Sequence, residues 1–251
     1  MSEWKYQPAR DHGLAPMARM RSFQREAGLF SATARVILWT AWSALLRVWN
    51  GLRVVGREHL PQSGSFILIA NHESHLDVFA LAAALPMRAR QHFIPLSAED
   101  VFFDRPTRTI LAAHILNALP VKRGRGVVHG LAAMRERLLR EPTVFVLFPA
   151  GKRSRDGSFV PFRAGIGMLV AGSEIPVVPC YVDGAFEALR PQTKLLRPAR
   201  MTVTIGAPIV FRDVSDNREG WDTIRVTLER SVRALGNEPA LDEHAPQLSA
   251  Q

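Results

Sequence analysis

Short apolar runs alternate along the chain with longer segments in which apolar residues recur every three or four positions. The runs are rich in β-branched and aromatic residues, and they predict strands at 52–55, 65–70, 92–96, 143–148, 175–182 and 202–205. The helical periodicity predicts helices at 78–85, 107–117, 126–140 and 218–235. Strands that alternate with helices predict an α/β fold, in which a single domain has a mixed, mostly parallel sheet flanked by helices.

A longer apolar stretch, Leu29 to Trp49, precedes this pattern. At helical spacing its apolar residues fill one stripe, which leaves out Arg35 and Arg47. Its length is near the roughly 20 residues that span a bilayer, but it contains both arginines. The pattern favours a helix in the membrane interface, whose arginines meet anionic phosphates and whose headgroup-level residues are Trp39, Trp42 and Trp49. A helix packed on the domain's own core and a spanning helix are the alternatives.

The chain divides into three predicted parts. Residues 1–50 form a basic, amphipathic, membrane-associating segment, and residues 51–236 form the α/β domain. Residues 237–251 contain Pro, Glu and Gln and are expected to be disordered. A chain of 251 residues that is 47% hydrophobic is large enough for one such core.

The charge balance indicates an anionic partner. The formal net charge is +9, which favours lipid headgroups or a phosphorylated substrate. The basic residues are spread between the apolar helix and several loops rather than gathered into a nucleic-acid-binding module, so no nucleic-acid partner is expected.

The single cysteine limits the kinds of site that the protein can have, and the polar start of the chain indicates its location. Cys180 is the only cysteine, which excludes an intramolecular disulfide and a cysteine-rich metal site, and its apolar surroundings predict that it is buried. The chain opens with polar residues of mixed charge rather than an ordinary signal peptide, so we expect the protein on the cytoplasmic side of the membrane.

A histidine and a carboxylate stand just beyond the 65–70 run. His72 and Asp77 are five positions apart, which on a straight helix would separate them by about 140° around the axis. They meet only if His72 lies in a turn and Asp77 in the first turn of the next helix. An imidazole near neutral pKa that is oriented by a carboxylate suits general-base catalysis. The alternative is a helix cap and a surface residue.

The order Asn71-His72-x-x-x-x-Asp77 resembles the signature of the glycerolipid acyltransferase superfamily, which includes the 1-acylglycerol-3-phosphate acyltransferases. Later segments resemble that family's other blocks in the same order, and together they cover roughly residues 50 to 210. The second block, a short strand that ends in an arginine, corresponds to Leu119 to Arg123, and the third, a loop at a strand end, to Phe148 to Ser154. The fourth, which helps to shape the acyl-chain tunnel in the family, corresponds to Ile175 to Val182, and a late turn to Gly206 to Pro208.

The third block departs from the family's pattern, which is Phe-Pro-Glu-Gly-Thr-Arg-Ser. Five of its seven positions agree, but Ala150 replaces the glutamate and Lys152 replaces the threonine. The glutamate is one of the family's functional residues for the acyl acceptor. Because this glutamate is replaced, a lyso-ornithine lipid and a glycolipid are alternative acyl acceptors. The added lysine makes this loop more cationic, which favours an anionic partner.

The resemblance implies that residues 51–236 are an acyltransferase domain. Its reaction would move a fatty acyl group from acyl-CoA or acyl carrier protein to the free hydroxyl of 1-acylglycerol-3-phosphate or a similar lysophospholipid. His72 would remove the hydroxyl proton and Asp77 would hold the imidazole. Substrate-binding positions would be Asn71, Arg123, Gly151, Lys152, Arg153 and Ser154.

The resemblance implies no cofactor and no metal, since the thioester is a co-substrate. The expected location is the cytoplasmic face of the cell membrane, with an anionic membrane surface as a partner. A catalytically silent protein that binds anionic membranes is the remaining alternative from a different functional class.

Overall fold

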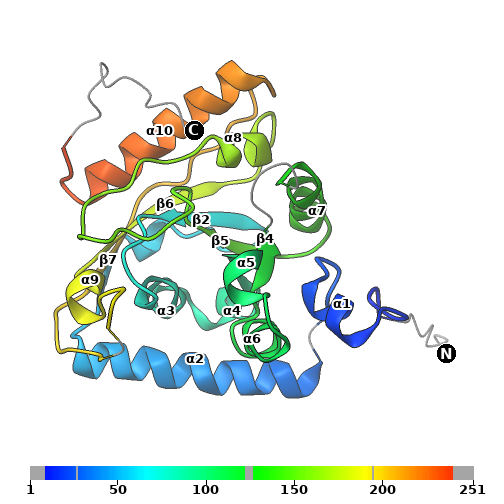
Figure 1. The fold of residues 1–251 in the computed structure, drawn as a ribbon. Coiled ribbons are helices and arrows are strands. Elements are labelled where there is room, and N and C mark those ends of the chain that lie inside the picture. Colours follow the sequence, from blue (N-terminus) through cyan, green and yellow to red (C-terminus); the bar gives the residue numbers. More distant parts are fainter. Residues whose placement is uncertain (1–8, 27, 122–126, 194, 240–251) are drawn as a thin grey trace.

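A seven-stranded sheet runs through the centre of the protein (Figure 1). The computed structural model describes residues 9–26, 28–121, 127–193 and 195–239. The strand order is β1-β7-β6-β2-β5-β3-β4. All neighbouring pairs are parallel except β6 and β7, so the predicted mixed, mostly parallel sheet is confirmed. The bounds are β1 (Arg53–Val55), β2 (Phe66–Ala70), β3 (Phe93–Ala98), β4 (Leu119–Val121), β5 (Val144–Leu147), β6 (Val177–Asp183) and β7 (Thr202–Ile205).

Helices cover both faces of this sheet. Figure 1 shows α7, α8 and α10 on one face, with α3 and then α2 on the other. The helical bounds are α1 (Pro16–Arg21), α2 (Leu29–Trp49), α3 (Leu76–Ala84), α4 (Met87–Arg90), α5 (Glu99–Phe102), α6 (Pro106–Ile110), α7 (Val127–Arg140), α8 (Gly165–Val170), α9 (Ala185–Ala188) and α10 (Arg218–Leu235), with a 3-10 turn η1 (Arg57–His59) and a π-helical turn η2 (Leu111–Ile115).

The central strand β2 contributes to a separate core on each face of the sheet. Phe66 and Leu68 pack in the core beneath α3, whereas Ile67 and Ile69 pack in the core beneath α8 and α10. All four side chains are buried because successive residues of a strand point to opposite faces and both faces are covered. This explains why the strand is a continuous apolar run, and it fixes the position of the turn that follows.

The helix α2 has the predicted bounds but packs with a different face from the one expected. Trp39 is 3% exposed, and its ring contacts Phe79 and Phe93 with centroids 5.3 and 5.2 Å away. Arg35 is also buried. The prediction that Trp39 and Arg35 are exposed at the membrane surface is therefore wrong, because both side chains are buried. Helical periodicity identifies the more apolar face of a helix. Here the buried face is instead the one that carries Trp39, because its ring packs against Phe79 and Phe93.

The apolar stripe of α2 lies on its outer side. Ile37 is 66% exposed and Val48 is 86% exposed, and Trp49 is about half exposed. Figure 1 shows this helix along one side of the protein, with the other elements of the domain on its inner side. No helix in the described part of the chain has the length and hydropathy needed to cross a membrane.

The strand β6 is an interior strand although it contains Pro179. It pairs with β2 on one side and β7 on the other. The register slips by one residue between the Cys180–Ile205 pair and the Val177–Ile209 bridge. Pro179 lies between them, where the regular ladder is interrupted. Two prolines in the 175–182 run favour an edge or a bulged strand, and the structure has the bulged form. Cys180 is buried, as predicted.

Candidate active site

The turn between β2 and α3 brings the predicted histidine and carboxylate together. His72 lies just beyond the end of β2, and Asp77 lies in the first turn of α3. The Nδ1 atom of His72 is 2.8 Å from Oδ2 of Asp77. The Asp77 side chain is fully buried, whereas the His72 side chain is 17% exposed. The pair therefore has an inner carboxylate and an imidazole that reaches solvent.

The Asp77 carboxylate is held by the backbone of the same turn. Its Oδ2 also accepts hydrogen bonds from the backbone N–H groups of Glu73 and Ser74, at 2.8 and 2.9 Å. A carboxylate that accepts several hydrogen bonds is stabilised in its charged form. Because an ionised carboxylate only accepts, the proton between the two side chains belongs to Nδ1 of His72. Its Nε2 is then free to accept a proton from a hydroxyl group.

Phe148, which follows β5, fixes the plane of the imidazole. The rings of His72 and Phe148 stack with their centroids 3.9 Å apart and their planes at 14°. The two residues meet because β2 and β5 are adjacent parallel strands, so their carboxyl ends lie at the same edge of the sheet. Sequence reasoning used Phe148 only as a motif position, because stacking between residues far apart in the chain has no local signal.

The loop at 149–154 is joined to the histidine turn by main-chain atoms. The backbone N–H of Ser154 donates to the carbonyl oxygen of His72 at 2.8 Å. The hydroxyl of Ser154 is buried and donates to the Asp156 carboxylate, and it accepts from the backbone N–H of Gly157. Ser154 thus holds the loop in place, and its predicted contact with substrate stays a prediction.

The cations of this loop lie around the same edge. Lys152 is exposed, and Gly151 adopts a φ of +70°, which a glycine tolerates best. Arg153 is partly buried, and within the described part of the chain its Nη1 atom is buried without a hydrogen-bond partner. A guanidinium nitrogen without a partner is suited to an anion. The predicted roles of Gly151, Lys152 and Arg153 toward substrate stay predictions.

Asn71 connects the histidine turn to β6. Its side chain donates to the carbonyl oxygen of Val182 and accepts from the N–H of the same residue, each at 2.8 Å. It also donates to Glu73 at 2.8 Å. These contacts give Asn71 a positioning role at the end of β2, and its predicted contact with substrate stays a prediction. Arg123 lies outside the described residues.

Glu73 is a buried carboxyl group that sequence reasoning missed. The residue is 7% exposed, and burial raises the pKa of its carboxyl group to about 7, although the hydrogen bond from Asn71 opposes this shift. The charge of Asp77 raises the pKa further. Glu73 is adjacent to the histidine in sequence, but its burial depends on the packing of other elements on the turn, which no local pattern reveals.

The side chain of Ala150 points into the apolar core beneath α8 and α10. Ala150 is 2% exposed and packs with the buried residues of that core. The residue that stands where the family has a glutamate therefore contributes to packing, and it offers no carboxylate to an acceptor.

Comparisons with known proteins agree with this geometry. A family model described as Acyltransferase matches residues 51–183, which is just over half of the chain. The chain is 26% identical over 203 residues to human "1-acyl-sn-glycerol-3-phosphate acyltransferase alpha", covering 70% of each. It is 29% identical over 180 residues to the "1-acyl-sn-glycerol-3-phosphate acyltransferase" of Limnanthes douglasii, covering 70% of this chain and 58% of the relative.

A solved structure has the same fold. The crystal structure of "the 1-acyl-sn-glycerophosphate (LPA) acyltransferase, PlsC, from Thermotoga maritima" matches with a TM-score of 0.59 and 22% identity, covering 80% of this chain and 79% of that one. The family model, the relatives and the histidine–aspartate turn lead to one conclusion: the chain belongs to the Acyltransferase family, within the glycerolipid acyltransferase superfamily, and is an acyltransferase.

Proposed function

We propose that this enzyme transfers a fatty acyl group from acyl-CoA or acyl carrier protein to the free hydroxyl of 1-acylglycerol-3-phosphate, or of a similar lysophospholipid, in phospholipid biosynthesis. The observation that carries the proposal is the 2.8 Å contact between His72 and Asp77 beside a cationic loop. The curated relatives named above carry this activity in their names, which supports the choice of acceptor.

The reaction follows from the protonation state of the pair. Nε2 of His72 accepts the proton of the acceptor hydroxyl as its oxygen attacks the thioester carbonyl carbon. The tetrahedral intermediate collapses by breaking the carbon–sulfur bond, and the departing thiolate takes the proton from the imidazolium. The products are an ester and a free thiol, and no acyl-enzyme forms. The buried charge of Asp77 stabilises the imidazolium during these steps.

The phosphate of the acceptor is assigned to the cations at this edge. Lys152 is exposed in the loop that is hydrogen-bonded to the His72 backbone, and Arg153 has a buried guanidinium nitrogen without a partner in the described part of the chain. A guanidinium group binds a phosphate with two parallel hydrogen bonds. Arg123 is also proposed to bind this phosphate, on the basis of the family resemblance alone.

Membrane association is the second part of the proposal. Leu29, Ile37 and Val48 are each more than half exposed on the outer side of α2. An exposed apolar helix face of this kind binds a lipid interface, because insertion removes the apolar surface from water. Both the acceptor and the product are lipids, so an enzyme at the cytoplasmic surface of an anionic membrane reaches them without extracting them into water.

The decisive experiment offers the protein lysophosphatidate with acyl-CoA, and separately with acyl carrier protein, and detects the diacyl product by mass spectrometry. We expect His72→Ala to lower the rate by about a thousandfold or more without changing the thermal unfolding temperature. His12→Ala, which removes an exposed histidine from the N-terminal segment, is the matched control. Full activity in His72→Ala would reject the proposed base.

A second acceptor class is kept for one reason, the buried alanine at position 150. With no carboxylate there, the site lacks one of the family's groups for the acceptor. The same assay therefore includes a lyso-ornithine lipid and a glycolipid. Transfer to one of these, and none to lysophosphatidate, would replace the proposed acceptor while leaving the proposed chemistry intact.

A further inference from the structure

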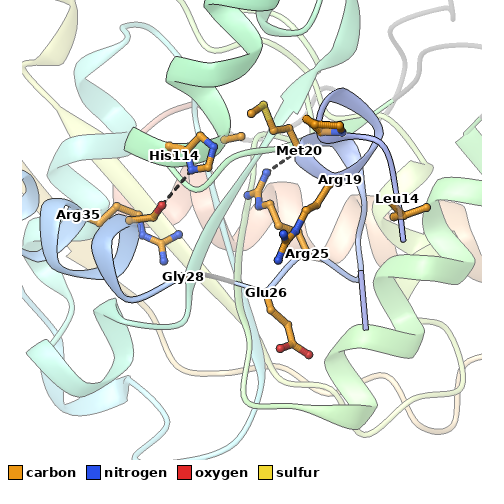
Figure 2. A pocket seen from close by; sticks show the side chains of 11 residues that line it. Leu14, Arg19, Met20, Arg25, Glu26, Gly28, Arg35 and His114 are labelled. Atoms are coloured by element: carbon orange, nitrogen blue, oxygen red, sulfur yellow. Dashed lines mark hydrogen bonds between the residues drawn. The ribbon is translucent and has the colours of Figure 1, made fainter. Parts of the chain in front are cut away.

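A pocket of about 320 Å³ lies between α1, the start of α2 and η2, and it shares no residue with the site around His72 (Figure 2). One part of its wall is apolar and includes Leu14, Pro16 and Met20. The polar part of the wall is strongly basic and consists of Arg19, Arg25, Glu26, Ser31, Arg35 and His114. The pocket therefore combines buried cations with an apolar side.

Arg35 is the unusual member of this wall. It is 8% exposed, and its guanidinium group makes no hydrogen bond or ion pair with another residue in the described part of the chain. The charges of Arg25 and Arg137 are close enough to act on one another and on Arg35, and they have the same sign. A buried charge without a partner has a large unfavourable desolvation energy, and like charges add to it. No acid among the described residues offsets this energy, and Arg35 lines two pockets.

The acids near the pocket are already paired with other arginines, one of which, Arg19, belongs to the pocket wall. Asp11 accepts from Arg19 at 2.6 Å, and Glu26 accepts from Arg10 at 3.1 Å. Figure 2 shows the Glu26 carboxylate turned away from Arg19 and Arg25. Within the described residues, the guanidinium group of Arg25 donates to neutral oxygens, namely two backbone carbonyls and the side chain of Asn117. Among the described residues, neither the Arg25 nor the Arg35 guanidinium group forms an ion pair, although the charge of Asp11 acts on Arg25.

The remaining polar groups of the pocket are neutral donors. Nδ1 of His114 is 3.0 Å from the hydroxyl of Ser31, as the dashed line in Figure 2 marks. Burial lowers the pKa of His114, and so do the charges of Arg25 and Arg35. The imidazole is therefore neutral at pH 7. One proton lies between the two groups, so the pair keeps a single donor for an anion beside the guanidinium groups, either the imidazole N–H or the hydroxyl.

We propose that this pocket binds the phosphate group of an anionic membrane phospholipid, with Arg35 as the principal donor. A guanidinium group forms two parallel hydrogen bonds with a phosphate, which would supply Arg35 with the partner that it lacks. The ligand is an accessory lipid rather than the acyl acceptor, because the pocket and the His72 edge have no residue in common.

The position of the pocket favours a lipid over a soluble phosphate. Gly28 and Ser31 at the start of α2 line it, next to Leu29, which is 85% exposed. On the other side of Arg35 lies a second pocket of about 430 Å³, whose apolar wall includes Val36, Trp39 and Phe93. A phosphate bound at Arg35 would thus leave its hydrocarbon chains next to apolar surface.

The test compares Arg35→Met with Arg47→Met, which removes the same charge from an exposed position of the same helix. Binding to phosphatidylcholine vesicles, with and without phosphatidylglycerol, is measured by co-sedimentation at fixed ionic strength and without an acyl donor. The result is therefore independent of the proposed reaction. We expect Arg35→Met to weaken binding to the anionic vesicles about tenfold, to leave binding to neutral vesicles unchanged, and to exceed the effect of Arg47→Met.

Thermal unfolding separates binding from folding. Because Arg35 is a buried charge without a partner, we expect Arg35→Met to unfold at the same temperature as the unmodified protein or at a higher one. We expect Arg35→Lys to keep part of the preference for anionic vesicles, since it keeps the charge.

Three results would overturn the proposal. Arg35→Met could unfold at a clearly lower temperature, which would make Arg35 a structural residue. Arg35→Met and Arg47→Met could lose anionic-vesicle binding equally, which would indicate diffuse surface charge. Inorganic phosphate or glycerol 3-phosphate could stabilise the protein through Arg35 with no preference for anionic vesicles, which would overturn the assignment to a lipid.

Discussion

Asp77 and Arg35 are two buried charges that the protein treats in opposite ways. Asp77 lies in the turn after β2, where a single carboxylate oxygen accepts from an imidazole and two backbone N–H groups. Arg35 lies in α2, where no residue in the described ranges accepts a hydrogen bond from its guanidinium group. Hydrogen bonds to a buried charge hold a site in place, whereas a buried charge without such bonds gains free energy when it binds a ligand of opposite charge. The comparison separates a charge that organises the fold from one that recognises a partner.

The largest expected effect is on catalysis at Asp77. Asp77→Asn keeps an oxygen that can accept from the backbone and the imidazole, but it removes the charge that stabilises the imidazolium. We expect kcat to fall by about a thousandfold with little loss of stability. The measurement is the rate of acyl transfer at saturating lysophosphatidate. Asp213→Asn, which alters an exposed aspartate, is the control, and near-normal turnover in Asp77→Asn would contradict the proposed role.

The next effect is on stability at the same position. Asp77→Ala leaves the buried N–H groups of Glu73 and Ser74 without an acceptor. We expect the free energy of unfolding to fall by roughly 2 to 4 kcal/mol. Denaturant titration of Asp77→Ala beside Arg35→Met is the direct comparison, because only the first should lose stability. Equal losses would remove the distinction between the two charges.

Glu73 is the intermediate case, because its pKa is raised to about 7 although it has a hydrogen-bond partner. The unfolded chain releases this proton near pH 4.5 and the folded protein near pH 7, so stability falls as the pH rises between these values. Glu73→Gln should remove this fall and stabilise the protein by roughly 2 kcal/mol at pH 8, with no gain at pH 4.

Denaturant titrations at several pH values test this expectation. Glu219→Gln, at an exposed site on α10, should keep the pH dependence of the unmodified protein. The same pH dependence in Glu73→Gln would show that another group is responsible.

The smallest expected effect concerns the orientation of the imidazole. Phe148→Leu keeps an apolar contact but removes the stacked ring that lies 3.9 Å from His72. We expect kcat to fall about fivefold, which corresponds to the energy of a ring–ring contact. Phe159→Leu is the matched control, because its ring pairs with Phe162 and not with the histidine. Similar rates in the two variants would indicate that the carboxylate alone holds the imidazole.

The sequence could predict the parts of the site that depend on neighbours in the chain. The spacing of His72 and Asp77 required a turn and a helix start, and the structure has both. The stacking of Phe148 could not be predicted, because it depends on β2 and β5 lying side by side. The burial of Glu73 could not be predicted either, because it depends on the elements that pack on the turn.

The strand order and α2 mark the same limit. Apolar runs indicated where the strands lie, but the one antiparallel pair, β6 and β7, depends on contacts between distant segments. Periodicity gave the bounds of α2 but not the face that the domain buries, since Trp39 turns inward to meet two phenylalanine rings. A local pattern predicts a helix or strand, and packing against distant segments determines its partners and the face that it buries.

The hydrogen bond from Ser154 to His72 joins the cationic loop to the base through main-chain atoms alone. Side chains at neighbouring loop positions can therefore be exchanged while the anchor of the loop is kept. New acceptor preferences could be selected in libraries built at Gly151, Lys152 and Arg153, while His72 and Asp77 are left unchanged.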